Sequence, residues 1–325
     1  MKAVRIIILT LYFGSGLVKA QQLPLYSQYM MNGFLLNPAV AGSDGYTTFN
    51  LTAREQWVGF ENSPRTHAFS IQTRILKKSF ILKGTPVKRR VYKPSTKGRV
   101  GVGGYIFNDR NGLVNRTGIQ LTYAYHIWLE ETQLSFGLSG SAFQFRVNDA
   151  ELTFFDPREP LLSGGLRKVI YVPDANFGMY LLHHKYSAGF SVAQLFQSAL
   201  KFGNKSFDDY RMLRHYYLMG TYRFDLNVDY QLEPSVLIKT TEQLLFQADI
   251  NCKIYYKNSY WAGLSFRTSG ALIAMAGVRV NQLYFGYAFD YTLTSIRKHS
   301  FGSHEVMIAL KLGDNARRYR WIDRY

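Results

Sequence analysis

The residue types that most often carry enzyme chemistry are sparse in this sequence and form no recognised catalytic pattern. The chain has seven histidines and a single cysteine, Cys252, so it can form no intrachain disulfide and no multi-cysteine zinc site. It contains no G-x-S-x-G, H-E-x-x-H or P-loop sequence, the signatures of serine hydrolases, zinc proteases and nucleotide-binding proteins. We therefore predict a protein that is not an enzyme and holds no cofactor.

The histidines offer no clear metal site in the sequence. His183 and His184 are adjacent in a predicted turn. Side chains of successive strand residues point to opposite faces, so we expect that these two do not converge on one metal ion. His215, His299 and His304 stand singly near predicted strand ends, as ordinary interfacial residues do. The sequence analysis therefore predicts no metal site.

The first twenty residues have the pattern of a secretory signal peptide. Lys2 and Arg5 precede a short apolar run at 6–13, and Ala20 is a small residue suited to signal peptidase. We expect an exported chain that starts at Gln21 or Gln22. The full sequence has a formal net charge of +17, which could favour nucleic acid, but an exported protein meets anionic surfaces and protein partners instead. We predict no nucleic-acid partner.

The rest of the chain alternates apolar and polar residues. Hydrophobic residues make up 47% of the sequence, yet the mean hydropathy is only −0.15, because polar residues are interspersed. The clearest stretches are 244–256, 283–291 and 305–311. Period-two alternation over about ten residues is typical of a transmembrane β-strand, apolar toward lipid and polar toward the lumen. A soluble β-sandwich would also alternate, but its polar face would usually carry more charge, so we favour the membrane barrel.

We predict an all-β, antiparallel transmembrane barrel of about fourteen strands. The expected strands are 46–57, 66–76, 100–109, 115–128, 132–146, 175–183, 186–195, 214–225, 228–239, 243–256, 259–267, 270–279, 281–291 and 303–312. The connections alternate between short turns, expected in the periplasm, and the long extracellular loops 147–174, 196–213 and 292–302. Pro234 cannot donate a ladder hydrogen bond, so we expect the ninth strand to bulge or start later there.

One expected periplasmic connection, 77–99, is long and strongly basic. It has nine basic residues and no acidic residue. It is either a solvated loop or an electrostatic docking site for an acidic periplasmic partner, in which case Lys88, Arg89, Arg90 and Lys93 are the expected contacts. The basic tail 313–325 lies on the same side. Inside the barrel, Arg74, Asp249, Lys253, Arg267, Arg279 and Asp290 are expected to form an ion-pair network or, alternatively, to line an open solute pathway.

Several motifs resemble one known family. The first follows the signal peptide at 23–42 and includes Tyr26, Ser27, Gln28, Tyr29, Asn37, Pro38 and Gly42. The second includes Gln56, Trp57, Gly59 and Phe60, and further matches lie at 107–109, 123–126, 134–137 and 302–305. Together they resemble the PorP/SprF family, outer-membrane proteins of the type IX secretion and gliding-motility machinery of Bacteroidota. The long basic connection 77–99 departs from the family pattern.

The resemblance implies a non-enzymatic outer-membrane accessory in a Gram-negative cell. Members are implicated in secretion or surface attachment of cargo with a C-terminal sorting domain, notably large adhesins. The implied partners are outer-membrane lipid, such cargo, and periplasmic secretion or gliding components. The alternatives are a small-solute channel or uptake protein and, with least support, a barrel enzyme. For the cargo contact we expect apolar anchors in the loop 147–174, namely Phe154, Phe155, Leu161 and Leu162.

The predicted organisation therefore has four parts: a signal peptide at 1–20, an N-terminal periplasmic segment at 21–45, the barrel at 46–312 and the tail. The segment 23–42 is too apolar to stay in periplasmic water as a free tail. It either packs into the periplasmic mouth of the barrel as a plug or is covered by a partner. We favour the mouth, because Gln28, Asn32 and Asn37 could satisfy polar groups of the lumen there.

Overall fold

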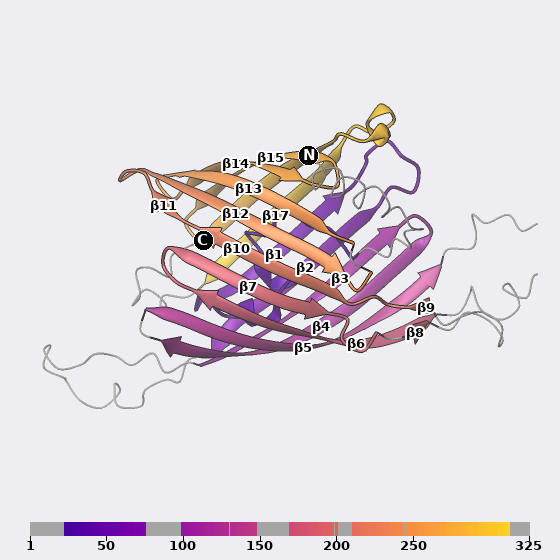
Figure 1. Ribbon diagram of the computed structural model, residues 1–325, viewed down its shortest axis with the longest axis horizontal. Helices are drawn as coiled ribbons and strands as arrows, with labels where there is room; N and C mark the ends of the chain where they lie inside the picture. Colours follow the sequence, from indigo (N-terminus) through magenta and orange to yellow (C-terminus); the bar gives the residue numbers. More distant parts are fainter. Residues whose placement is uncertain are drawn as a thin grey trace, which may run out of the picture.

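The computed structural model describes residues 23–75, 99–129, 131–147, 169–197, 199–200, 210–243 and 245–312. In these ranges the chain forms short 3-10 turns and many strands (Figure 1). The turns are η1 (Gly33–Leu35), η2 (Pro38–Val40) and η5 (Ser295–Lys298). The strands are β1 (Thr47–Glu55), β2 (Arg65–Ile75), β3 (Val100–Asn111), β4 (Val114–Leu129), β5 (Thr132–Val147), β6 (Ile170–Leu182), β7 (Tyr186–Ala193), β8 (Ala199–Leu200), β9 (Tyr210–Arg211), β10 (His215–Tyr222), β11 (Phe224–Asp225), β12 (Tyr230–Thr241), β13 (Gln247–Tyr256), β14 (Tyr260–Arg267), β15 (Ala271–Val280), β16 (Leu283–Thr292) and β17 (Ser303–Leu312). None of the described helices has the length and apolar character needed to span a membrane.

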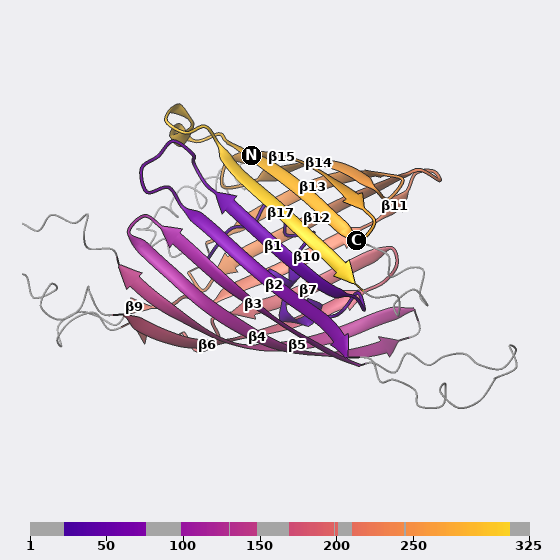
Figure 2. The same ribbon diagram turned by 180° about the vertical axis from the view of Figure 1, so that it is seen from behind.

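The long strands close into one antiparallel barrel. Its order is β10-β7-β6-β5-β4-β3-β2-β1-β17-β16-β15-β14-β13-β12, and β12 pairs back onto β10. The first and last barrel strands meet along nine residue pairs, from Thr47 opposite Leu312 to Glu55 opposite His304, and they lie side by side in Figure 2. The described strands thus confirm the predicted barrel of fourteen strands, with β11 a short continuation of β10.

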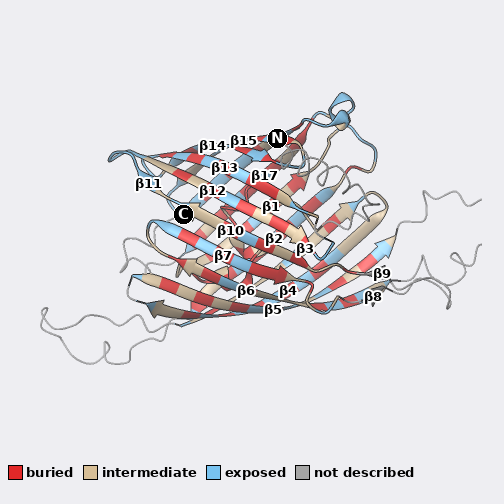
Figure 3. Ribbon diagram, in the orientation of Figure 1, coloured by how far each residue is buried: buried red, intermediate tan, exposed pale blue. Residues whose placement is uncertain are grey.

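Alternation along each strand sets which face meets lipid. In β13, Ile250 and Ile254 are exposed on the outer face, whereas Asn251 and Lys253 are buried on the inner face. The same alternation of buried and exposed residues is clear in β16 and β17 (Figure 3). An apolar outer surface with a polar interior is the arrangement that a lipid bilayer requires of a barrel.

The barrel has two different ends, which we call the turn end and the loop end. The turn end holds the start of β1, the end of β17 and tight turns such as 257–258, where Lys257 and Asn258 both adopt positive φ, as a type I′ turn requires. The loop end holds the connections 56–64 and 293–302. Because bacterial outer-membrane barrels place short turns in the periplasm, we take the turn end as periplasmic and the loop end as extracellular.

Two of the strands that contain proline differ from expectation. β6 begins at Ile170 rather than at residue 175, and Pro173 lies within its ladder opposite Ala142. β12 runs without a bulge through Pro234, which pairs with Cys252 of β13. The other edge of β12 pairs with β10 and β11, and the ladder there is interrupted between these two strands. At the interruption the Arg223 N–H donates to the Lys185 carbonyl at 2.6 Å. The prediction that this strand bulges or starts later at Pro234 was wrong. Proline lacks an N–H donor, and the resulting interruption lies in the neighbouring strand rather than in β12.

Candidate functional site

The N-terminal motif lies inside the barrel. Tyr26, Ser27, Gln28, Tyr29 and Asn37 are each less than a tenth exposed. At one end of the segment, Leu23 and Leu25 line a cavity with Trp57, Asn111 and Arg116 at the loop end. At its other end, near the turn end, Asp44 forms an ion pair of 3.4 Å with the Lys311 ammonium. The segment therefore runs through the lumen from the loop end to the turn end, a longer path than the expected packing into the periplasmic mouth.

Five buried ionic residues, which we call the charge centre, converge on one side of the lumen: Arg54, Asp249, Arg267, Asp290 and Glu305. The Arg54 guanidinium lies 2.6 Å from Asp290 and 3.2 Å from Glu305. Arg267 lies 3.2 Å from the same Asp290 and 2.9 Å from Asp249. All five are less than a twentieth exposed. Buried charges are tolerated only when paired and hydrogen-bonded, and the network meets that condition across β1, β13, β14, β16 and β17.

The charge centre also binds the N-terminal segment. The backbone N–H groups of Ser27 and Gln28 donate to the two carboxylate oxygens of Glu305 at 2.7 and 2.8 Å. The Ser27 hydroxyl lies 2.8 Å from Asp290 and 2.7 Å from the Arg54 guanidinium. Two successive amides held by one buried carboxylate make a strong, charge-assisted contact. The segment is thereby fixed to the wall at the β16–β17–β1 seam.

Tyrosines of the segment occupy the apolar parts of the lumen. Tyr29 accepts a hydrogen bond from the Asn251 side chain and packs with Trp261 and Met275 in the main apolar cluster. Tyrosine side chains are neutral at physiological pH, because a phenol ionises only at about pH 10, so Tyr26 and Tyr29 add no charge to the lumen.

On the opposite wall the segment docks against four glycines, Gly101, Gly137, Gly178 and Gly189, which we call the glycine socket. A Cβ atom at Gly137 would lie 2.3 Å from the Ala39 backbone, and one at Gly178 would lie 2.0 Å from the Asn37 side chain. Gly137 and Gly178 are direct partners in the β5–β6 ladder. Only glycine permits so close an approach between a strand and another backbone.

Asn37 is the residue that enters the socket. Its side-chain oxygen accepts the Ala39 N–H at 2.9 Å and so caps η2, as asparagine does at helix starts. Its amide nitrogen donates to the carbonyls of Met179 and Phe190, in β6 and β7, at 2.9 and 3.3 Å. Gly42, with a φ of +66°, then turns the chain where a Cβ would meet the Thr73 carbonyl at 2.7 Å.

The second motif lies at the loop end, where it joins two connections. The Trp57 N–H donates to the Ser303 hydroxyl at 3.1 Å, and the Val58 N–H donates to the Gly302 carbonyl at 2.8 Å. The Gln56 N–H donates to the Pro64 carbonyl at 2.8 Å. Gly59 packs against Phe301, and the ring of Phe60 stands edge-on to His299 with centroids 6.4 Å apart. The motif thus holds the connection 56–64 against 293–302.

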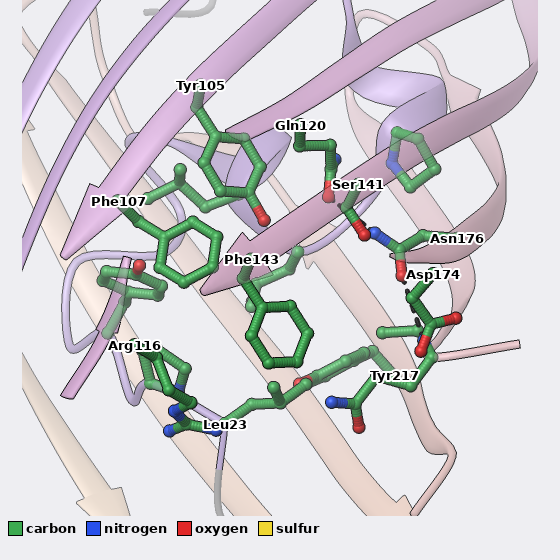
Figure 4. A pocket seen from close by; sticks show the side chains of 17 residues that line it. Leu23, Tyr105, Phe107, Arg116, Gln120, Ser141, Phe143, Asp174, Asn176 and Tyr217 are labelled. Carbon is green, nitrogen blue, oxygen red and sulfur yellow. Dashed lines mark hydrogen bonds between the residues drawn. The ribbon is translucent and has the colours of Figure 1, made fainter. Parts of the chain in front are cut away.

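A cavity of about 90 Å³ lies between the N-terminal segment and strands β3 to β7 and β10. Rings from Tyr105, Phe107 and Phe143 border it on one side, and Asn176 and Asp174 border it on another (Figure 4). Leu23 also lines the cavity. Arg116, another lining residue, forms an ion pair of 2.5 Å with Asp109. The cavity is mainly apolar with a few fixed polar groups, the general character of binding pockets.

The other charged residues expected inside the barrel have different partners. Lys253 pairs with Glu233 at 2.9 Å, and Arg223 pairs with the same carboxylate at 3.0 Å. Arg74 donates to Gln133 at 2.6 Å and to the Ser43 carbonyl at 3.1 Å. Arg279 instead donates to the Asn281 carbonyl at 3.2 Å at the turn end, away from the charge centre. Sequence analysis missed Arg54 and Glu305 as ionic partners, although Glu305 lies in the quoted match 302–305.

The histidine pair contradicts the expectation that its side chains diverge. His183 and His184 lie in the turn between β6 and β7, and their ring centroids are 4.0 Å apart. The alternation rule holds for extended strands only, and a turn reverses the chain between the two residues. Glu131, in the neighbouring turn, lies 3.8 Å from the His183 Nε2 atom.

Other residues singled out in the sequence lie outside the described part of the chain. These are the expected periplasmic contacts Lys88, Arg89, Arg90 and Lys93, and the expected cargo contacts Phe154, Phe155, Leu161 and Leu162. The expected signal peptide and the tail 313–325 also lie outside it.

A family model described as "Type IX secretion system membrane protein PorP/SprF" matches residues 18–310. The chain belongs to the PorP/SprF family. The match spans both motifs, the charge centre and the glycine socket. The family and the barrel fold together place the protein in the outer membrane, with a role in type IX secretion. A search of curated proteins finds no match.

Solved outer-membrane barrels resemble this PorP/SprF protein at low similarity. A FadL homologue from Pseudomonas aeruginosa is 9% identical, with a TM-score of 0.45 over 85% of this chain and 91% of that chain. CdiB from Acinetobacter baumannii is 9% identical, with a TM-score of 0.44 over 82% and 60%. A TodX monoaromatic hydrocarbon channel mutant is 10% identical, with a TM-score of 0.41 over 86% and 93%. At this level of similarity none of them carries a functional argument.

Proposed function

We propose that this PorP/SprF protein is a non-enzymatic accessory that supports secretion or surface attachment of a cargo with a C-terminal sorting domain, such as an adhesin. The barrel acts as a binding platform in the outer membrane. It holds cargo at the loop end and contacts periplasmic secretion or gliding components at the turn end.

The occupied lumen is the observation that carries this proposal. The segment 23–45 is fixed to Glu305 on one wall and reaches the carbonyls of Met179 and Phe190 on the other. These contacts span the barrel, since β17 and β6 are nearly opposite in the strand order. A folded cargo domain would have to displace the segment and break its contacts with the charge centre, so a platform is favoured over a conduit.

The loop end supplies the surface for cargo. The cavity lined by Tyr105, Phe107 and Phe143 lies toward this end. The linked connections 56–64 and 293–302 also lie there, and their side chains Phe60 and Phe301 are substantially exposed. The proposed cargo contacts are Phe154, Phe155, Leu161 and Leu162, which belong to the connection between β5 and β6. Buried aromatic and aliphatic anchors usually dominate the energy of such interfaces.

The test uses native cells that produce a tagged copy of the protein. Its complex is purified and the bound surface protein identified, and surface display of that protein is then measured by protease shaving with and without the barrel gene. We expect display to fall when the gene is deleted and to return when it is restored. A matched strain with residues 148–168 replaced by a short linker should insert the barrel normally yet fail to restore display. Unchanged display in the deletion strain would overturn the proposal.

The alternative, a small-solute channel, is separated by single-channel conductance in planar bilayers. The platform predicts little conductance from the wild type and a large increase when residues 23–42 are removed, because β1 and β17 still close the barrel. A wild-type barrel with stable, open-channel conductance would favour the solute channel.

A further inference from the structure

Two neighbouring turns at the turn end bring together three side chains with metal-ligating atoms. Glu131 lies in the β4–β5 turn, and His183 and His184 lie in the β6–β7 turn. Their carboxylate and imidazole ligand atoms all lie within 4.8 Å of one another, and no other group of this kind occurs in the described ranges. We propose that Glu131, His183 and His184 form a binding site for a zinc-class divalent cation on the periplasmic rim.

The donor set selects the class of cation. Two imidazoles and one carboxylate are the three protein ligands of many zinc sites, in which a fourth position remains for water or another donor. Imidazole also suits copper and nickel, whereas calcium and magnesium require oxygen ligands almost throughout. The site therefore binds Zn²⁺, Ni²⁺ or Cu²⁺ and discriminates against Ca²⁺ and Mg²⁺.

The geometry needs only small side-chain movements. The Glu131 carboxylate is 3.8 Å from the His183 Nε2 atom. Two ligands of a tetrahedral zinc ion, each about 2.0–2.1 Å from the metal, lie slightly closer together than this. Glu131 is largely exposed, so its side chain can rotate inward. His183 is only 15% exposed, and its ring stacks on Tyr186 at a centroid distance of 4.5 Å, which holds one ligand in place.

The contact between Lys185 and His183 must change when the ion binds. The Lys185 N–H donates to the His183 Nδ1 atom at 3.3 Å, which leaves the proton of a neutral ring on Nε2. Coordination through Nε2 moves that proton to Nδ1 and ends this contact, which is already longer than a usual N–H···O bond. The β6–β7 turn keeps its own hydrogen bond, from the His183 N–H to the Tyr186 carbonyl at 2.8 Å, so the backbone need not open.

Binding would join the turns of two neighbouring hairpins through one shared ion. β4–β5 and β6–β7 are adjacent hairpins in the barrel wall. A cation shared by their turns fixes the rim on the side that faces periplasmic components. This inference is independent of the cargo proposal, because it involves neither the lumen nor the loop end.

The experiment measures binding of Zn²⁺ alone to the full chain, refolded in detergent without a histidine tag, by isothermal titration calorimetry. We expect one equivalent to bind, and Ca²⁺ to give no signal. His183→Ala and His184→Ala should each weaken affinity by at least about tenfold, since loss of even an outer partner of a zinc ligand typically costs that much. Glu131→Gln should also weaken it. His299→Ala, which removes an exposed histidine at the loop end, is the matched control and should change nothing.

Folding of each variant is checked by heat-modifiable migration on gels, so a lost signal cannot be confused with a lost barrel. Thermal unfolding gives a second readout, in which Zn²⁺ should stabilise the wild type but not the His183→Ala variant. Zinc binding that is absent in the wild type, or equally strong in the His183→Ala/His184→Ala double variant, would overturn the proposal.

Discussion

Arg54 and Glu305 are direct partners in the ladder where the first and last barrel strands meet, and their side chains form an ion pair of 3.2 Å inside the lumen. Glu305 also accepts the backbone N–H groups of Ser27 and Gln28. One carboxylate thus joins three parts of the chain: the first strand, the last strand and the N-terminal segment. Glu305 therefore couples the seam between β1 and β17 to the position of the N-terminal segment.

This coupling predicts a large effect of removing one charge. Glu305→Ala leaves Arg54 buried with one carboxylate partner fewer and leaves two backbone amides without acceptors. Breaking a buried pair in this way costs about 3–5 kcal/mol. We expect a lower urea midpoint for the refolded barrel, measured by the loss of heat-modifiable migration.

The control is an exposed ion pair between β1 and β2. Glu55 and Arg65 are 3.6 Å apart and about half exposed, so Glu55→Ala should change stability by about 0–1 kcal/mol. Equal losses in the Glu305 and Glu55 variants would show that the charge centre contributes no more than an ordinary surface pair.

The glycine socket predicts a change that affects the segment more than the barrel. In Gly178→Ala the added methyl group would occupy the position of the Asn37 side chain, and such overpacking costs about 1–3 kcal/mol. We expect the barrel to form but the segment to leave its site. Limited proteolysis should then cut between Tyr29 and Leu36, which the wild type protects.

Gly140→Ala is the matched variant for this test. Gly140 lies in the strand next to Gly178, and a Cβ there would meet nothing within 4 Å. Its proteolysis pattern should equal that of the wild type. Rapid cleavage of the wild type itself at 29–36 would contradict the placement of the segment in the lumen.

The path of the segment predicts which side of the membrane its first described residue faces. Leu23 lines a loop-end cavity with Trp57 and Arg116. In a Cys252→Ser background, Leu23→Cys should react with a membrane-impermeant maleimide added to intact cells. Glu61→Cys, exposed in a loop-end connection, should react likewise, whereas Asp229→Cys, exposed at the turn end, should react only after the outer membrane is opened. Labelling of Leu23→Cys only after opening would place the segment's start in the periplasm.

The barrel could be predicted from the sequence because its information is local. In β13 the contrast between Ile250, Ile254 and the inward Asn251, Lys253 appears within a few residues, and period-two alternation needs no partner to be recognised. The start of β6 was missed, because β6 runs through Pro173 and a proline inside a ladder is normally evidence against a strand.

The candidate site could be predicted only in part, since its contacts are long-range. Arg54 and Glu305 are 251 positions apart, and neither stands out within its own strand. One signal was present: both lie on the polar face of the two strands that closure must pair. The convergence of His183 and His184 was missed for a different reason, because strand alternation was applied to a turn.

The last prediction concerns the basic stretch 77–99, which joins β2 to β3 at the turn end. We propose that Lys88, Arg89, Arg90 and Lys93 attract an acidic periplasmic partner through charge. Exposed charges are screened over about 8 Å at physiological ionic strength, so association measured by co-purification should weaken as salt rises. Neutralising the four residues to glutamine should weaken association at low salt and remove most of its salt dependence, while heat-modifiable migration stays normal. Replacing residues 148–168 at the loop end should leave this association intact. Association that is insensitive both to salt and to the four substitutions would leave the basic stretch as a solvated loop and move the periplasmic contact elsewhere on the turn end.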